Sequence, residues 1–258
     1  MLHFNYGNPV YQFHDSDKGL IKRFVGVEIE VADFTNDPSI EKRLEDVIAK
    51  WGGTLKGDGS VHGTHPFEIN TAPARGQQFV KQIREICGVL REGKAGVNRT
   101  CGLHVHIDAR DFAPNDLLKV AMVWRKVESQ AMQRVAPSRR ANGYCLPASA
   151  YIENALSHNT IDAFYNLSHA PRHMALNCSS YNYKKTLENR LHHGTTNSHK
   201  IISWARLNSK MVEFAKNHSL EEIKTIPNID LNQFEPQRYP IAEANEAPAP
   251  PTYLVRIN

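Results

Sequence analysis

This sequence of 258 residues lacks several features that would place it in a specialised class of protein. No apolar run reaches the roughly 18 residues that a membrane-spanning helix needs. Residues 1–20 show no basic segment followed by an apolar one, as a secretory signal would. The four cysteines form no CxxC pair, which argues against a disulfide framework and a thiolate zinc site. We therefore expect a cytoplasmic protein with reduced thiols and no membrane partner.

Strong net charge and internal repeats are also absent. The net charge of +4 is compatible with an anionic ligand such as a nucleotide, but it is too small to indicate a nucleic-acid partner. With 41% hydrophobic and 22% charged residues, the chain has the composition of a globular protein. We expect an N-terminal arm over residues 1–20, a folded domain over 21–226 and an extended, proline-rich tail over 227–258.

Helix-like and strand-like segments alternate along the folded domain. Asp37 and Ser198 are the expected N-caps of two helices, and Ser219 with Glu222 has the spacing of a capping box. The strands are expected at "FVGVEIEV", "PFEIN", "CGLHVHID" and "TLENRLHHG". Each alternates apolar and polar residues, whereas buried parallel strands are usually continuously apolar. This favours an α+β fold, in which helices cover one face of an antiparallel sheet and leave the other open.

The polar faces of these strands carry ionisable residues of few types. In "FVGVEIEV", Glu28 and Glu30 share one face, although neighbouring like charges repel. The corresponding faces of the other strands carry Glu68, His104, His106, Asp108, Glu188, Arg190 and His192. Contact with solvent would explain any one of these strands alone. Four of them together indicate a metal or phosphate site, in which cations offset the repulsion between the carboxylates.

Two kinds of metal are compatible with this set of side chains. Carboxylates with one or two imidazoles suit divalent cations, and oxygen ligands favour Mg²⁺ or Mn²⁺. Mg²⁺ is commonly shared with substrate phosphates, which fits a nucleotide site. Zinc remains an alternative because His104, His106 and the His192–His193 pair offer nitrogen ligands. A zinc-dependent hydrolase that uses the HxH strand is therefore a second hypothesis.

The order of several short motifs resembles one known family. The motifs are "GVEIE", "GDGSV", "FEINTAP", "CGLHVHID", "RxxxYCLP" and "ENRLHHGT", over about residues 22–212. In this order they resemble the putative amidoligase family, which belongs to the carboxylate–amine ligases with a glutamine synthetase-like fold. The resemblance implies that residues 21–226 form the catalytic domain. It implies a curved antiparallel sheet that forms a funnel, with helices on its outer face and with ATP, substrates and two or more divalent ions inside.

The same resemblance implies roles for individual residues. It assigns metal binding to Glu28, Glu30, Glu68, His104 and Glu188. It places His106 and Arg190 at the ATP phosphates. It also places either Arg139 or Arg140 at the phosphates or the substrate carboxylate, without deciding between them. Asp58 in "GDGS" resembles an acidic turn that binds metal or the amine substrate.

The implied activity is ATP-dependent formation of an amide or peptide bond. A carboxylate is a poor electrophile, so ATP would first convert it into an acyl phosphate, which an amine would then attack. Arg190 would stabilise the transferred phosphoryl group, and Asp58 would deprotonate the amine. The sequence does not identify the acid and the amine, which an amino acid, a peptide or a protein could supply, nor the oligomeric state. A third hypothesis is a catalytically silent binding protein on the same fold.

Overall fold

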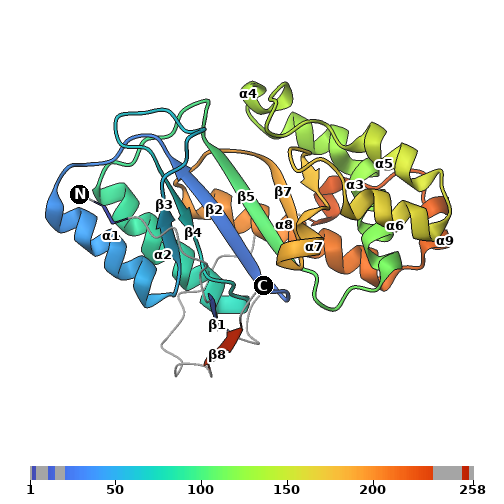
Figure 1. Cartoon of the computed structure of the whole chain (residues 1–258), viewed down its shortest axis with the longest axis horizontal. Helices are drawn as coiled ribbons and strands as arrows, with labels where there is room; N and C mark the ends of the chain where they lie inside the picture. Colours follow the sequence, from blue (N-terminus) through green and yellow to red (C-terminus); the bar gives the residue numbers. More distant parts are fainter. Residues whose placement is uncertain (1, 4–10, 15–20, 235–251, 256–258) are drawn as a thin grey trace.

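The computed structural model describes residues 2–3, 11–14, 21–234 and 252–255, and its central feature is a six-stranded antiparallel sheet (Figure 1). The strand order is β3-β4-β2-β5-β7-β6, and the sheet is open. The strands are β2 (Val25–Val31), β3 (Thr54–Lys56), β4 (Phe67–Asn70), β5 (Gly102–Asp108), β6 (Leu176–Asn177) and β7 (Thr186–His193). The α+β class and the antiparallel pairing are therefore confirmed. Closure into a funnel stays an implication of the resemblance.

Helices account for most of the remaining described chain. They are α1 (Pro38–Lys50), α2 (Gly76–Glu92), α3 (Pro114–Gln133), α4 (Pro137–Arg140), α5 (Ser149–Leu156), α6 (Thr160–Ser168), α7 (Ser180–Lys184), α8 (Ser198–Asn217), α9 (Leu220–Thr225) and the 3₁₀ helix η1 (Leu231–Phe234). None of the helices in the described ranges is long and apolar enough to cross a membrane.

The ends of three helices test the predicted caps. The side chain of Asp37 accepts a hydrogen bond from the backbone N–H of Ser39 and caps α1, as predicted. Ser219 and Glu222 form the predicted capping box of α9. The prediction for α8 is wrong by one residue, because Asn197 is the N-cap and Ser198 is already helical. Both residue types cap well, so composition alone did not separate them.

The core forms between one face of the sheet and the helices behind it. The strands contribute buried apolar residues such as Val27, Ile29 and Val105, and they pack in one cluster with residues such as Phe79 of α2 and Ile201 of α8. Burial of this apolar surface is the main term that holds the sheet and helices together. The polar residues of the strands therefore lie on the opposite face, away from this core.

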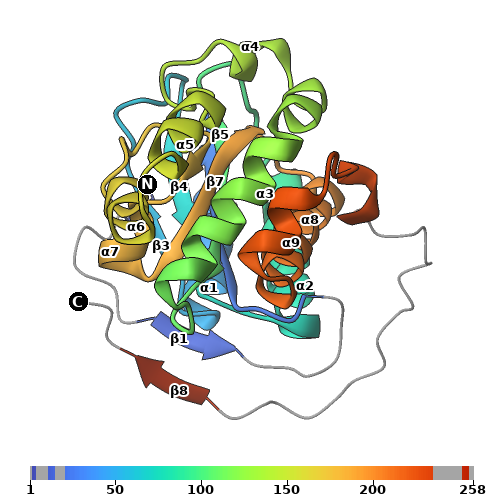
Figure 2. The ribbon, with the colours of Figure 1, turned by 90° about the vertical axis from the view of Figure 1, so that its right-hand side faces the viewer.

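Parts of the predicted arm and of the predicted tail form regular structure or belong to the core. Within the predicted tail, Ile229, Leu231 and Phe234 are buried in the main core. Within the predicted arm, β1 (Tyr11–His14) pairs antiparallel with β8 (Thr252–Val255), apart from the main sheet (Figure 2). The rest of the arm, except residues 2–3, lies outside the described residues, and so does the tail beyond Phe234, except β8.

A bulge interrupts the pairing of β5 with β7. Val105 pairs with Asn189 and Leu103 with His192, so β7 advances three residues where β5 advances two. An extra residue in one strand changes which side the following side chains face. The ring of His192 accordingly lies 5.1 Å from that of Trp204 on α8. The prediction that His192 shares the open face with Glu188 and Arg190 is therefore wrong, because the bulge breaks the alternation.

Candidate functional site

The register of the sheet brings the predicted acidic residues together on the open face. On β2, Glu28 lies between His104 of β5 and Asn70 of β4. Two residues further along β2, Glu30 lies opposite Glu68 of β4. Directly paired residues of antiparallel strands have Cβ atoms about 4.5–5.5 Å apart, so these side chains contact one another across the strands.

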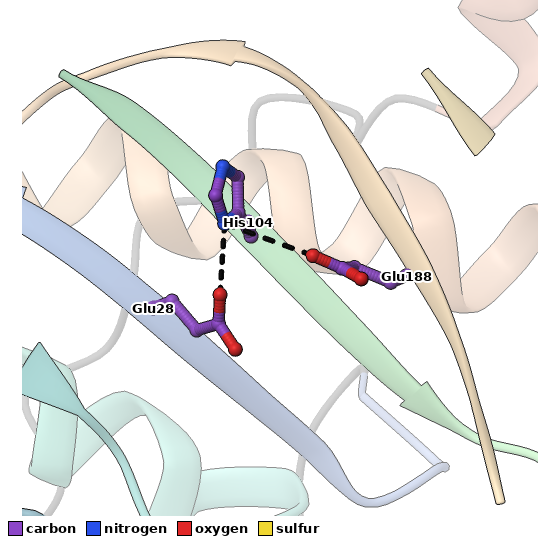
Figure 3. A group of neighbouring side chains, drawn as sticks. All are labelled: Glu28, His104 and Glu188. Atoms are coloured by element: carbon purple, nitrogen blue, oxygen red, sulfur yellow. Dashed lines mark hydrogen bonds and ion pairs between the residues drawn. The ribbon is translucent and has the colours of Figure 1, made fainter. Parts of the chain in front are cut away.

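One group of possible metal ligands consists of Glu28, His104 and Glu188, each from a different strand (Figure 3). Nδ1 of His104 lies 2.8 Å from Oε2 of Glu28 and 3.7 Å from Oε1 of Glu188. Each residue offers one ligand atom, and these atoms all lie within 4.8 Å of one another. Such spacing is compatible with a single divalent ion between two carboxylates and an imidazole.

A second group consists of Glu30, Glu68 and again His104. Nε2 of His104 lies 3.5 Å from Oε1 of Glu30. The second oxygen of Glu30 accepts a hydrogen bond from the backbone N–H of Gly102 at 2.6 Å, and Asn70 donates to Glu68 at 2.5 Å. The two groups share the imidazole of His104, so they lie next to each other. A neutral imidazole has one free lone pair, so His104 can ligate an ion in one group at a time. Each of the five residues that were predicted as metal ligands belongs to at least one of these two groups, and His104 belongs to both.

Two of the carboxylates have a lowered pKa. Burial raises the pKa of Glu28, but the positive charges of His106 and Lys184 and the hydrogen bond with His104 together bring it well below the usual value. Burial also raises the pKa of Glu188, and His106 and Arg190 lower it to a net value below normal. Both carboxylates are therefore ionised at neutral pH and available to a cation.

The other two carboxylates have a raised pKa. Burial and repulsion by Glu28 raise the pKa of Glu68 to about 7. Burial is also the largest cause of the raised pKa of Glu30, which the nearby His104 lowers in part. The pKa of His104 is raised even though burial lowers it, because the carboxylates around it favour the protonated ring. The metal-free site therefore holds excess negative charge, which protons offset in part and which a divalent cation would neutralise more fully.

Glu28, Glu30, Glu68 and His104 line a pocket of about 160 Å³, whereas Glu188 is not among its lining residues. Its acidic lining consists of Glu28, Glu30, Glu68 and Asp58. Its basic lining consists of Arg139, Arg172 and Arg190, and Ser60, Thr100, His104 and Tyr144 complete it. A pocket of this kind can hold cations at its carboxylates and anionic oxygens at its arginines.

The arginines of the site are held by specific contacts. Nη1 of Arg190 forms an ion pair with Oε1 of Glu188, and its Nε donates to the carbonyl of Tyr144 at 3.1 Å. Arg139 is buried and donates to the carbonyl oxygens of Arg190, at 2.5 Å, and Leu191, at 3.4 Å. These two carbonyls belong to the bulge of β7. Arg139 therefore lines the pocket and also stabilises the strand that carries Arg190.

Arg140 lies elsewhere. It donates hydrogen bonds to the carbonyls of Gln133 and Val135, just after α3, and it is not among the residues that line the pocket. The sequence left the choice between Arg139 and Arg140 open, and the geometry favours Arg139.

Asp58 and His106 lie at different depths. Asp58 lines the pocket, and its Oδ1 accepts hydrogen bonds from the backbone N–H and the hydroxyl of Ser60, both at 2.7 Å. His106 is buried and does not line the pocket. Its Nε2 lies 3.0 Å from Oε1 of Glu28, and its Nδ1 lies 3.1 Å from Oγ1 of Thr186. In this arrangement His106 positions Glu28.

Five residues at the site were not predicted. Ser60, Thr100, Tyr144 and Arg172 line the pocket, and Nζ of Lys184 of α7 lies 3.0 Å from Oε1 of Glu28. Tyr144 lies in the connection between α4 and α5, and Arg172 lies in the connection between α6 and β6. Tyr144 stands in the motif "RxxxYCLP" and could have been proposed from it. Lys184 and Arg172 belong to no motif or periodic pattern, so the sequence offered no signal for them.

Comparison with models of protein families identifies the family of this chain. Residues 36–212, more than half of the chain, match the model of a family described as "putative amidoligase enzyme". The match includes Glu68, His104, Glu188 and Arg190, whereas β2, with Glu28 and Glu30, lies just before it. The match begins at residue 36, whereas the motifs that carry the resemblance begin near residue 22. No curated protein matches the chain.

Proposed function

The chain belongs to the putative amidoligase family, and from this premise we propose that it is an ATP-dependent carboxylate–amine ligase. The observation that carries the proposal is the pocket itself. It brings four of the five candidate metal ligands, Glu28, Glu30, Glu68 and His104, into one cavity with three arginines. Phosphoryl transfer from a metal nucleotide needs both parts, because charge must be neutralised on the phosphates and on the group that is transferred.

The side chains fit Mg²⁺ or Mn²⁺. Among the described residues, each candidate group offers two carboxylates and one imidazole, and no group contains a second imidazole or a cysteine. Oxygen-rich sets favour the hard divalent cations over zinc. We propose that Glu28 and Glu188 hold one ion, that Glu30 and Glu68 hold another, and that His104 ligates one of the two through its single free nitrogen lone pair. Bound ions would neutralise phosphate charge and orient the nucleotide.

The arginines would act on the phosphates and on the substrate carboxylate. Arg190 is fixed by Glu188 and by the carbonyl of Tyr144, so its guanidinium is held for charge-assisted contact with phosphoryl oxygens. Arg139 lies beside it, buried and bound to the backbone of the same strand. Arg172 is exposed at the pocket and lies where an anionic substrate can be recognised.

The reaction would take place in two steps. A carboxylate oxygen of the acid attacks the γ-phosphorus of ATP, which forms an acyl phosphate and releases ADP. The amine nitrogen then attacks the acyl carbon, the C–N bond forms and inorganic phosphate leaves. The attacking nitrogen must first lose a proton, and Asp58 is the proposed acceptor because it lies in the pocket with the metal ligands.

The zinc-hydrolase hypothesis receives less support from the geometry. Of the two histidines in the HxH strand, His104 belongs to both candidate groups, whereas His106 belongs to neither and does not line the pocket. His192 contacts α8 on the other side of the sheet. A zinc site with two or three nitrogen ligands would need a second imidazole in one of the candidate groups.

The test is release of ADP from ATP by the full chain, with pools of acids and amines and with Mg²⁺ or Mn²⁺. We expect release that needs an acid, an amine and the metal together, and that falls at least a hundredfold in Glu68→Gln. Glu45→Gln, at a half-buried position on α1 outside the pocket, is the matched control and should retain full activity. If the folded protein releases no ADP with any pool, the proposal fails and the silent-binder hypothesis replaces it.

A further inference from the structure

A second pocket, of about 390 Å³, lies beside α8 at the end of β7. Its lining residues come from three parts of the chain: Arg134 after α3, His192 and His193 of β7, and Lys200, Ser203, Trp204 and Leu207 of α8. None of them belongs to the site described above. The bulge of β7 separates the two pockets, because it directs His192 to the side of the sheet that α8 covers.

The charge of this pocket is positive. Arg134 and Lys200 line it, and no carboxylate from the described residues does. Nη2 of Arg134 donates to the side-chain oxygen of Asn232 at 2.7 Å, which holds the guanidinium in place. Lys200 forms no ion pair within the part of the chain that the structure describes. The pKa of His193 is lowered, first by burial and then by the charges of Lys200 and Arg139, as expected near cations.

One wall of the pocket is aromatic and neutral. The rings of His192 and His193 stack with centroids 4.2 Å apart and planes 22° apart, and the ring of Trp204 lies 5.1 Å from that of His192. Nδ1 of His192 lies 2.6 Å from the carbonyl oxygen of His193, so Nδ1 carries the proton and Nε2 is left as an acceptor. Burial lowers the pKa of His192 to about 4, so its ring is uncharged at neutral pH.

We propose that this pocket binds a small organic anion with a planar ring. The ring would pack against the imidazole and indole wall, and the anionic group, a carboxylate or a phosphate, would bind Lys200 and Arg134. The volume is in the range of sites that hold small molecules, about 300–1,000 Å³. The pocket does not suit a metal ion, because Arg134 and Lys200 line it and no carboxylate from the described residues does. It also does not suit a neutral apolar ligand, because that would leave the ammonium group of Lys200 without a counter-ion.

The test is isothermal titration of the full chain, without divalent ions, with five small probes. Benzoate and phenyl phosphate carry both a ring and a charge, and they distinguish a carboxylate from a phosphate ligand. Acetate and inorganic phosphate lack the ring, and benzyl alcohol lacks the charge. We expect saturable binding of one of the first two probes to a single site. The three incomplete probes should bind at least tenfold more weakly.

Two variants assign the binding to this pocket. Lys200→Ala removes an exposed cation of the pocket and should weaken binding at least tenfold, with an unchanged thermal melt. Lys210→Ala removes the same charge from the same helix outside the pocket, and it should bind as the unchanged protein does. The proposal is overturned if no probe saturates or if Lys200→Ala binds as well as Lys210→Ala. Inorganic phosphate that binds as tightly as phenyl phosphate would equally overturn it, because the ring would then contribute nothing.

Discussion

Glu30 of β2 and Glu68 of β4 lie directly opposite each other on adjacent antiparallel strands, one buried and the other half-buried. Like charges in such a pair destabilise a sheet unless something positive lies near them. His104 is within 3.5 Å of Glu30, and it is already shared with Glu28. The pair therefore lacks enough compensation within the protein, which is the physical basis for the metal site that we propose.

The first prediction concerns Glu68. Its folded-state pKa of about 7 lies above the unfolded value of 4.5, so its contribution favours folding at low pH and is lost as the pH rises to 7. In metal-free protein at pH 8, Glu68→Gln should therefore raise the free energy of unfolding, by about 1–3 kcal/mol. Urea unfolding in the presence of a chelator measures this. A decrease in the free energy of unfolding would show that groups of the protein already neutralise the negative charge of Glu68.

The same variant should respond differently to metal. Saturating Mn²⁺ should stabilise the unchanged protein by about 3 kcal/mol at a hundredfold excess over its dissociation constant. Glu68→Gln should lose most of this gain, because it lacks one ligand oxygen charge. Thermal melts with and without Mn²⁺ compare the two proteins, with Glu45→Gln as the control. If Mn²⁺ stabilised the unchanged protein, Glu68→Gln and Glu45→Gln equally, the ion would bind away from Glu68.

The second prediction concerns the two adjacent arginines. Arg139→Gln should reduce ADP release at least a hundredfold and also lower stability, since Arg139 lines the pocket and binds two carbonyls of the bulge. Arg140→Gln should leave ADP release within about twofold, because the hydrogen bonds of Arg140 within the described residues go to the carbonyls of Gln133 and Val135 at the end of α3, outside the pocket. Steady-state kinetics of the two variants provide the comparison. Equal losses would contradict the assignment.

The third prediction separates two roles for His106. The resemblance places it at the ATP phosphates, whereas the structure places it against Glu28 and Thr186. If it positions Glu28, His106→Gln should weaken Mn²⁺ binding roughly 10–100-fold in the absence of nucleotide. If it binds phosphate, the same variant should raise the KM for ATP and leave Mn²⁺ affinity unchanged. We expect the first outcome from metal titration followed by calorimetry.

The fourth prediction concerns stability in acid. The folded pKa of His192, about 4, lies below the usual 6.5, so its contribution to stability is present above pH 6.5 and is lost as the pH falls towards 4. Between pH 7 and pH 5 this amounts to about 2 kcal/mol. His192→Phe keeps a ring against Trp204 but cannot take up a proton, so its stability should fall less over this interval. Denaturant unfolding at both pH values measures the difference. An equal loss of stability in the unchanged protein and in His192→Phe would contradict the prediction.

The residues on the open face of the sheet were predictable from the sequence because successive side chains of a strand point to opposite faces. Glu28, Glu30, Glu68, His104 and Glu188 were assigned to one side by alternation alone, and antiparallel pairing brings them together. Periodicity carries no information about register, so the order of the strands and the two ligand groups became known only from the structure.

Other features depended on contacts that no local pattern encodes. The position of His192 depends on a single extra residue in β7, and alternation fails beyond it. Lys184 comes from the five-residue helix α7, which was not predicted because it is too short to show a period. Arg172 enters the pocket from a connecting segment, and tertiary packing alone places it there.

The extra residue in β7 also keeps a nitrogen donor out of the acidic pocket. His192 pairs with Leu103, whose side chain is buried in the core, so the imidazole lies on that side of the sheet, against Trp204. If β7 continued beyond Asn189 without the bulge, alternation would place the same imidazole on the face of Glu188 and Arg190. The pocket would then gain a second nitrogen donor, and its preference would move from hard cations towards zinc. An irregularity of one residue in the pairing of two strands thus separates two metal chemistries that the same sequence could support.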